Sequence, residues 1–460
     1  MRIPVWLTLA SALVTLGVVI IIGMALIQPN VPLIRHAEFK LDRITPNADG
    51  DSDITEFSYS LSRTARITLI LEDDRGNRYA FREDEGRAAQ DYSVLFSGVV
   101  DGFVLPGEEF AGEIQRRLLP NGRYTWRLQA VGQEREETDE RTGVFVIEEA
   151  DLPLPEISIF TVAPETFTPN QDGIDDRVQI NVFLEKESEL SVYLLDSDGT
   201  RIFIPEVKEG RQPGEAGRHS FDYEAGVDRN ADPPPDGRYT LVAEAQDDEG
   251  QRVQRTANLT IEAGGKPLAE IVPQTAGVDV VFAVQPYDET YYSDAEQPGA
   301  RVRIPDNPQD LSLTTLTIPL GDMLVFKLTV ENYSRVPIRT TGPPPGTVYA
   351  QEQNAATLGW VEESGAWRIG IHCQTSSINN PWRWAIGTDD DLIVEFDPNT
   401  GQEHHYLPPG QRAVVWGAIR MTEIEARNPQ NCGANLIHED VEISVRNSNV
   451  GTRQVELVAP

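Results

Sequence analysis

Apolar and polar residues alternate in short stretches along most of the chain after residue 30. Phe57, Tyr59 and Leu61 alternate with polar residues, and the stretch 67–71 repeats the pattern a few positions later. Alternation with a period of two over four to eight residues is typical of a strand with one buried face. The pattern therefore predicts an all-β protein built from short strands.

The same pattern returns further along the chain. Residues 45–78 align with residues 168–201 without a gap, and 11 of the 34 pairs are identical. PNGRYT at 120–125 then matches PDGRYT at 235–240, but the offset has fallen from 123 to 115. This change places a length difference in the middle of the two copies, where loops vary. The repeat predicts two tandem β-sandwiches.

Each copy contains TPNxDGxxD, alternating strands, a D-x-x-G turn and a P-N/D-G-R-Y-T turn. This order resembles the immunoglobulin-like domain of the flagellar hook-capping protein family. The resemblance implies Ig-like sandwiches at 30–150 and 151–264, used for spacing, assembly or adhesion. The first copy departs from the family pattern at 100–126, where it is longer. No flagellar role is implied, because a hydrophobic N-terminal segment stands in place of a hook-assembly region.

The N-terminal segment 5–27 has 23 residues and no charge. A bilayer-spanning helix needs about 20 apolar residues. Arg2 precedes the segment, and acidic residues dominate beyond it. The positive-inside rule therefore predicts a single-pass anchor within 1–29 of the bacterial cytoplasmic membrane, with the N-terminus inside. The remainder is expected to be extracytoplasmic, at the cell surface. The alternative is a cleaved signal peptide with a small-x-small site at 23–25.

Residues 265–460 differ in composition, because they hold five of the seven tryptophans. Strand patterns recur there at 278–284, 323–332, 366–373, 412–421, 440–445 and 452–458. They predict a third, larger, aromatic-rich β-sandwich domain, which is weakly similar to bacterial immunoglobulin-like domains. The linkers 148–156 and 262–270 are short and contain proline, so the three domains are expected to form a semi-rigid rod.

Acidic residues outnumber basic ones by 73 to 39, for a net charge of −34. Nucleic-acid binding needs a basic surface that replaces phosphate counterions, so this balance excludes it. Docking on anionic lipid is disfavoured for the same reason. The balance favours solubility and cation binding.

The two TPNxDGxxD loops are candidate calcium sites, because Ca²⁺ prefers six to eight oxygen ligands. The candidate ligands are Asn47, Asp49, Asp53, Asn170, Asp172 and Asp176. EF-hand spacing is not met, since Gly50 occupies the fourth position and not the sixth. The alternative is an Asx-type turn that starts the first strand. A metal site would need further oxygens from another loop, such as those of Asp228, Asn230 and Asp232.

Cys373 and Cys432 are the only cysteines. A disulfide between them is expected in an oxidising compartment and would contribute about 4 kcal/mol on the chain-entropy estimate, although two free thiols are the alternative. Trp382 and Trp384 are a candidate interaction surface for sugars or proteins, or else part of the core. None of the six histidines has zinc-protease spacing, and they are interpreted as surface or loop residues.

These observations favour a non-catalytic, membrane-anchored structural or binding protein. Its two-domain stalk presents the C-terminal domain, for adhesion or as an accessory subunit of a cell-envelope assembly. Neither a nucleophile elbow nor a phosphate or dinucleotide loop occurs in the sequence, so no enzyme and no cofactor other than calcium is expected. The expected partners are envelope proteins or a glycan. The alternatives are a carbohydrate-binding surface protein and a hydrolase with its site in 265–460.

Overall fold

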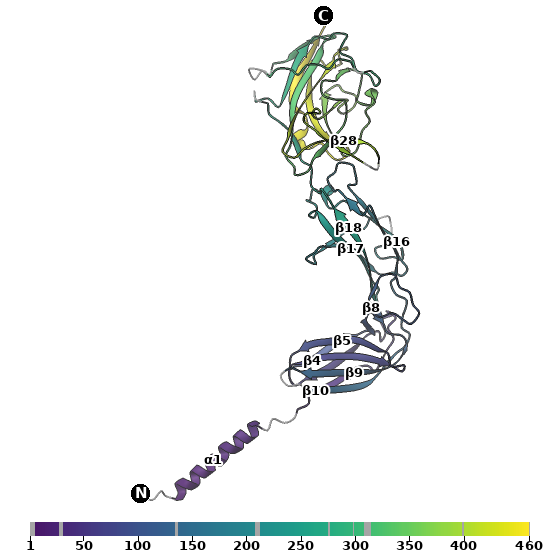
Figure 1. Ribbon diagram of the computed structural model, residues 1–460, viewed down its shortest axis with the longest axis vertical. Coiled ribbons are helices and arrows are strands. Elements are labelled where there is room, and N and C mark those ends of the chain that lie inside the picture. The colour runs from purple at the N-terminus through teal and green to yellow at the C-terminus, as the bar shows by residue number, and fades with distance from the viewer. Residues whose placement is uncertain are drawn as a thin grey trace.

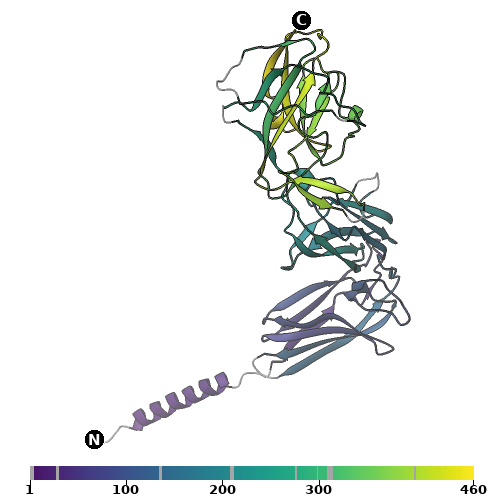
Figure 2. The ribbon, with the colours of Figure 1, turned by 45° about the horizontal axis from the view of Figure 1, so that its top comes forward.

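The computed structural model describes residues 5–26, 31–133, 137–207, 212–274, 277–297, 299–307, 314–397 and 400–459. One helix is followed by three β units arranged in a row from the N-terminal to the C-terminal end (Figure 1). The view in Figure 2 shows the same succession of units. The all-β prediction is confirmed.

The helix α1, Val5–Leu26, extends away from the β units (Figure 1). Ile27, the last residue of the expected membrane span, lies outside the described residues. In the part of the chain that the structure describes, no helix is both long enough and apolar enough to cross a membrane. A single-pass anchor needs both properties in one helix. The single-pass, N-in membrane localisation expected from the segment 5–27 is therefore wrong, and the membrane as a partner is not shown.

The first two β units share one topology, which confirms the tandem repeat. The first unit has a sheet of β1 (Ile34–Phe39), β3 (Thr55–Leu61) and β6 (Asp91–Phe96), and a second sheet of β2 (Arg43–Ile44), β10 (Thr138–Ile147), β9 (Gly122–Gly132), β4 (Ala65–Asp73) and β5 (Arg78–Arg87). The second unit repeats them as β11 (Ile157–Ala163), β13 (Val178–Leu184) and β16 (Gly217–Tyr223), and as β12 (Thr166–Phe167), β18 (Arg252–Ile261), β17 (Gly237–Gln246), β14 (Glu189–Leu195) and β15 (Arg201–Phe203). In both units the short second strand runs parallel to the last one.

The alternation read from the sequence places side chains as predicted. Phe57 on β3 and Leu128 on β9 belong to one hydrophobic core, so the two sheets of the first unit pack as a sandwich. Val178 and Leu241 share the equivalent core of the second unit. Burying one large apolar side chain contributes roughly 1.5–3 kcal/mol, and each core contains many of them.

The repeated P-N/D-G-R-Y-T turn closes in the same way in both units. Tyr124 donates its hydroxyl hydrogen bond to the carbonyl of Pro120 at 2.6 Å, and Tyr239 donates to Pro235 at 2.6 Å. Both rings are buried. In each unit this hydrogen bond therefore ties a buried tyrosine near the start of a strand to the turn that precedes the strand.

The third unit is larger. One sheet contains β19 (Ala269–Val272), β22 (Met323–Asn332), β29 (Arg412–Arg420) and β24 (Val348–Ala350), with β20 (Val280–Gln285) pairing β22. The other contains β21 (Leu316–Pro319), β31 (Val450–Val458), β30 (Gln430–His438), β25 (Trp367–Cys373), β23 (Ile338–Thr340), β28 (Glu403–Leu407) and β27 (Ile393–Phe396), with β26 (Trp382–Ala385) pairing β25.

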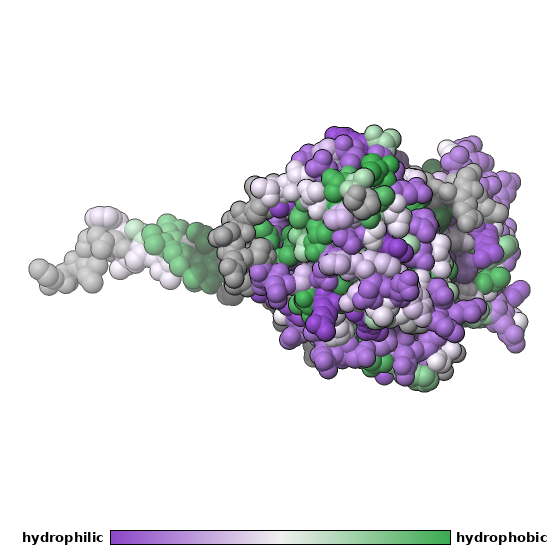
Figure 3. Space-filling view, turned by 90° about the horizontal axis from the view of Figure 1, so that it is seen from above, coloured by the Kyte–Doolittle hydropathy of each residue, from purple (hydrophilic) through white to green (hydrophobic). Residues whose placement is uncertain are grey.

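Seen from above, this end of the molecule is mostly hydrophilic, with hydrophobic residues in small patches (Figure 3).

The strand predicted at 440–445 is wrong. Its apolar residues Val441 and Val445 are exposed, and Glu442 forms only an isolated bridge to His438. The nearest strand is β30, which ends at His438, just before the predicted segment. Because almost every residue of β30 is buried, it carries no alternation that a sequence pattern could reveal.

The first and second units share a continuous sheet. The long middle segment of the first unit forms β7 (Val99–Asp101) and β8 (Glu113–Leu118). Strand β8 pairs antiparallel with β18, so the sheet of the second unit continues into the first (Figure 1). The segment in which the first copy is longer than the second is thus the one that joins the two units.

Buried polar groups strengthen this junction. Gln251 is fully buried and donates to the backbone carbonyl of Asp151 in the linker at 3.1 Å. Lys186 contacts the carboxylates of Asp151 at 2.9 Å, Asp247 at 2.8 Å and Glu249 at 2.9 Å. Burial by itself lowers the pKa of Lys186, but the hydrogen bonds to these carboxylates outweigh it and raise the pKa above its ordinary value. The linker is therefore held in one position.

Candidate functional site

The TPNxDGxxD loops are closed by their own side chains. In the first loop Asp53 accepts hydrogen bonds from the backbone N–H groups of Asn47 at 3.0 Å and Gly50 at 2.7 Å. Asn47 in turn accepts one from the backbone of Asp49 at 3.1 Å. The second loop repeats these bonds at the equivalent positions. Both loops therefore have the geometry of Asx-type turns, which was the alternative to a calcium site.

The same oxygens are the candidate calcium ligands of Asn47, Asp49, Asp53, Asn170, Asp172 and Asp176. Within the described ranges, no group of three or more His, Cys, Asp or Glu side chains is placed to hold a metal ion. Asp228 does reach the second loop, where it accepts a hydrogen bond from Gln171 at 3.0 Å and pairs with Arg177. Calcium binding stays a prediction, and it would require these bonds to be exchanged for metal contacts.

Asp172 sets the second loop apart from the first, because it contacts the third unit. Its Oδ2 accepts a hydrogen bond from the Tyr406 hydroxyl on β28 at 3.0 Å, and its backbone carbonyl accepts one from Arg339 Nε on β23 at 2.6 Å. Asp172 and Arg339 are 6% and 5% exposed, whereas Asp49 at the equivalent position is exposed. The second loop therefore docks on the third sandwich.

Two glycines allow this close approach. A Cβ atom on Gly173 would lie 2.0 Å from the carbonyl oxygen of Ser364, and one on Gly365 would lie 2.2 Å from the carbonyl carbon of Asp172. Gly50, at the equivalent position of the first loop, has no such neighbour within 4 Å. The backbones of the second and third units meet too closely for any side chain at these points.

Burial shifts the pKa of two groups at the joint where the second loop docks on the third sandwich. His438 donates from Nε2 to the carbonyl of Gln171 at 2.8 Å, and burial lowers the pKa of this histidine to about 4. Burial raises the pKa of Asp176 to about 6, and the negative charge of Asp172 adds to the effect. The interpretation of the histidines as surface or loop residues is wrong for His438 and for His219, which are 3% and 1% exposed.

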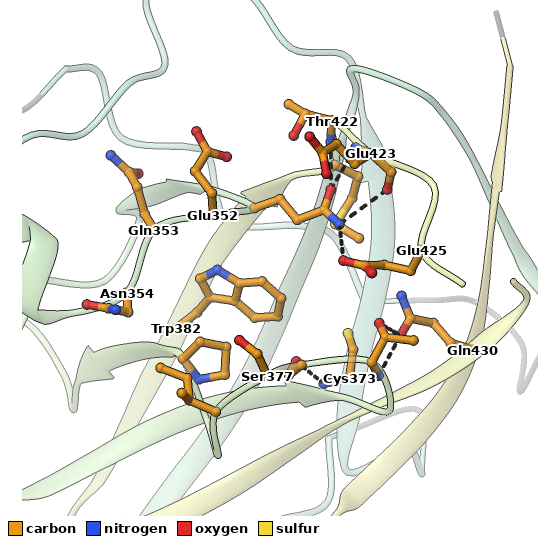
Figure 4. Close-up of a pocket in the computed structure, with 16 residues that line it drawn as sticks. Glu352, Gln353, Asn354, Cys373, Ser377, Trp382, Thr422, Glu423, Glu425 and Gln430 are labelled. Carbon is orange, nitrogen blue, oxygen red and sulfur yellow. Dashed lines mark hydrogen bonds between the residues drawn. The ribbon is translucent and has the colours of Figure 1, made fainter. Parts of the chain in front are cut away.

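A pocket of about 690 Å³ opens in the third sandwich (Figure 4). This volume lies within the range of roughly 300–1,000 Å³ that is common for ligand sites. Its walls are the segments 351–354, 375–381 and 421–425. Gln351 ties the first wall to the third, since it accepts from the backbone of Thr422 at 2.8 Å and donates to Glu425 at 3.1 Å. The pocket is held open by hydrogen bonds within the protein.

Trp382 and Trp384 lie on the same face of β26, because they are two residues apart on a strand. They are 4% and 0% exposed and both belong to the core, so the two rings do not form an exposed aromatic surface. Their N–H groups differ. Trp384 donates to the carbonyl of Thr347 at 3.0 Å, whereas Trp382 Nε1 is buried without a hydrogen-bond partner among the described residues. Trp382 alone of the two borders the pocket.

The disulfide between Cys373 and Cys432 is confirmed. The two residues are directly opposite in the antiparallel pair β25–β30, with Cα atoms 4.0 Å apart. Cys373 also borders the pocket. The bond thus fixes two strands beneath the pocket walls.

No protein-family model and no curated protein matches this sequence. Among solved structures the chain is similar to a tetra-tandem repeat in the extending region of a large adhesion protein, with 10% identity, coverage of 91% of this chain and 90% of that chain, and a TM-score of 0.17. It is also similar to a 1.5-MDa bacterial ice-binding adhesin, with 8% identity, coverage of 93% and 96%, and a TM-score of 0.18. TM-scores this low support no inference about function, and the likeness to the hook-capping family rests on its motifs.

Proposed function

We propose that this protein is a non-catalytic spacer and binding protein. Two immunoglobulin-like repeats, 30–150 and 151–264, form a stiff stalk, and the third sandwich, 265–460, contacts the partner. Such a protein serves in adhesion or as an accessory subunit of a larger assembly. The observation that carries the proposal is that the second repeat is attached to its neighbours at both ends.

A flexible linker would leave the backbone polar groups at each junction to water. Here β8 extends the sheet of the second repeat at one end, and the Asp172 loop is buried against Tyr406 and Arg339 at the other. Bending at either junction would break buried hydrogen bonds, and each buried polar group left without its partner costs about 1–3 kcal/mol. Contacts of this kind support a rod and not a chain of independent domains.

Electron–electron distance measurements between spin labels test the stalk. The labelling sites are exposed residues, one in each unit: Leu95→Cys, Phe203→Cys and Val445→Cys. We expect a single narrow distance distribution for the pair 95 and 203 and for the pair 203 and 445. A broad or multiple distribution for either pair would show that the units move independently, and the spacer function would fail.

A further inference from the structure

The pocket in the third sandwich offers one buried donor and several acceptors. Trp382 is 4% exposed, and its Nε1–H has no hydrogen-bond partner in the described part of the chain. In Figure 4 its indole lies between Glu352 and Ser377 and borders the cavity. An indole N–H can only donate, so an acceptor on a ligand would satisfy this group.

Three carboxylates line the same space. Glu352, Glu423 and Glu425 all border the pocket, and an ionised carboxylate only accepts hydrogen bonds. The ligand must therefore donate to these groups while it accepts from the indole. A hydroxyl group does both, because it has one O–H donor and two lone pairs.

The charges of the lining residues restrict the class of ligand further. The 16 lining residues in Figure 4 include no Lys, Arg or His, so nothing there would neutralise an anion. A cation would suit the carboxylates, but a cation without an acceptor atom would leave the Trp382 Nε1–H without a hydrogen bond. A neutral, hydroxyl-rich ligand meets all of these conditions.

A peptide fits less well. Extended peptides are recognised by adding a strand to a free sheet edge, whereas loops form most of this pocket. The lining is also dominated by amide, hydroxyl and carboxylate side chains, with apolar contacts from Ile378 and Pro381 beside the indole. That mixture suits the C–H and O–H groups of a sugar ring.

We propose that this pocket binds a neutral carbohydrate, with the Trp382 N–H and the Glu352 carboxylate contacting sugar hydroxyl groups. The inference rests on the proposed function, since it names the ligand class of the binding domain. It assigns the unpaired indole N–H and the acidic walls to one site.

The test uses the full chain and four neutral probes: cellotetraose, maltotetraose, xylotetraose and mannotetraose. Oligogalacturonate serves as the acidic counterpart, and a library of unmodified peptides serves as the competing class. Calorimetry measures affinity, and tryptophan fluorescence reports on the site. We expect at least one neutral probe to bind, and oligogalacturonate to bind at least about tenfold more weakly because the walls are acidic.

Variants test the residues. Trp382→Phe keeps an aromatic ring but removes the N–H, and we expect about a fivefold loss of affinity. Trp384→Phe is the matched control on the same strand: its N–H is bonded inside the protein, so affinity should stay unchanged. Glu352→Ala changes an exposed rim residue, is expected to fold, and should weaken binding about fivefold.

Binding of none of the neutral probes, or a preference for oligogalacturonate or for peptides, would overturn the inference. So would an affinity of the Trp382→Phe and Glu352→Ala variants equal to that of the natural chain. Spin-label distances test the stalk separately, so narrow distances without sugar binding would refute this inference and leave the spacer intact. Shortened probe products in chromatography would keep the ligand class but contradict the non-catalytic function.

Discussion

The hydroxyl group of Tyr406 donates a hydrogen bond to Asp172 Oδ2 at 3.0 Å, and this contact joins the second repeat to the third sandwich. The two residues are 5% and 6% exposed. A carboxylate buried without partners would be strongly unfavourable. The bond supplies this side chain with a donor from the neighbouring unit.

Removing that donor should loosen the joint. Tyr406→Phe leaves a buried carboxylate oxygen without its partner, so we expect a loss of about 1–3 kcal/mol in urea denaturation and a broader distance distribution between positions 203 and 445. Tyr349→Phe is the control, because its hydroxyl donates to the carbonyl of Arg383 within the third sandwich, at 2.7 Å. That variant should lower stability but keep the distance narrow. Unchanged distances in Tyr406→Phe would show that the bond does not hold the joint.

The paired loops provide a second test. Gly173→Ala and Gly50→Ala introduce the same strain, since φ is +84° at one position and +87° at the other. Only the first places a methyl group against a neighbouring backbone, 2.0 Å from the Ser364 oxygen. We expect Gly50→Ala to cost about 1 kcal/mol and keep the rod shape, while Gly173→Ala opens the second joint. Small-angle X-ray scattering distinguishes them, and identical profiles would contradict the close docking.

Two groups at this joint shift stability with pH in opposite directions. The pKa of His438 is lowered to about 4 from 6.5, so its contribution is complete above pH 6.5 and is lost as the pH falls toward 4. The pKa of Asp176 is raised to about 6 from 3.8, so its contribution is complete below pH 3.8 and is lost as the pH rises toward 6. A shift of two units corresponds to about 3 kcal/mol.

The two terms oppose each other in the natural chain, and single substitutions should reveal each one. Between about pH 4 and 6.5, the slope of the unfolding free energy against pH should be more positive in Asp176→Asn than in the natural chain, because the Asp176 term is removed. The slope should be more negative in His438→Gln than in the natural chain, because the His438 term is removed. Urea denaturation across this range measures both slopes. Equal slopes in the two variants would refute the assignment.

Calcium should leave the two repeats unchanged. The candidate ligands already accept hydrogen bonds from their own loops, as Asp53 does from Gly50 at 2.7 Å. We therefore expect the same melting temperature in calcium and in chelator. A rise in calcium that disappears in Asp53→Asn or Asp176→Asn would instead establish a metal site in the corresponding loop.

The disulfide should stabilise the third sandwich strongly. Cys373 and Cys432 are 59 residues apart, and closing a loop of that length contributes about 4 kcal/mol on the chain-entropy estimate. The double variant Cys373→Ser with Cys432→Ser should lower the unfolding free energy of this unit by about that amount. The two repeats contain no cysteine and should melt as before, also under reducing conditions. A loss that spreads equally over all units would contradict this assignment.

Several features were predictable because they depend on local pattern. Strand β3 was readable because one of its faces is buried and the other is not, so Phe57 and Tyr59 alternate with polar residues. Strand β30 was not readable, because both of its faces are buried. The same limit applies to Trp382 and Trp384, since sequence spacing shows that they share a face but not which side of the sheet faces the core.

The β architecture, the tandem repeat, the two equivalent turns and the pair of cysteines available for a disulfide could all be read from the sequence. These follow from side-chain periodicity, turn residues and composition, which are properties of neighbouring positions. The fold was needed to show that Asp172 is buried where Asp49 is exposed, that β8 joins the two repeats, and that the Trp382 N–H lies unpaired beside a pocket. Each depends on which surfaces meet between segments that are not neighbours in the chain. TPNADGDSD and TPNQDGIDD are too similar for their sequences to record the difference between the two loops.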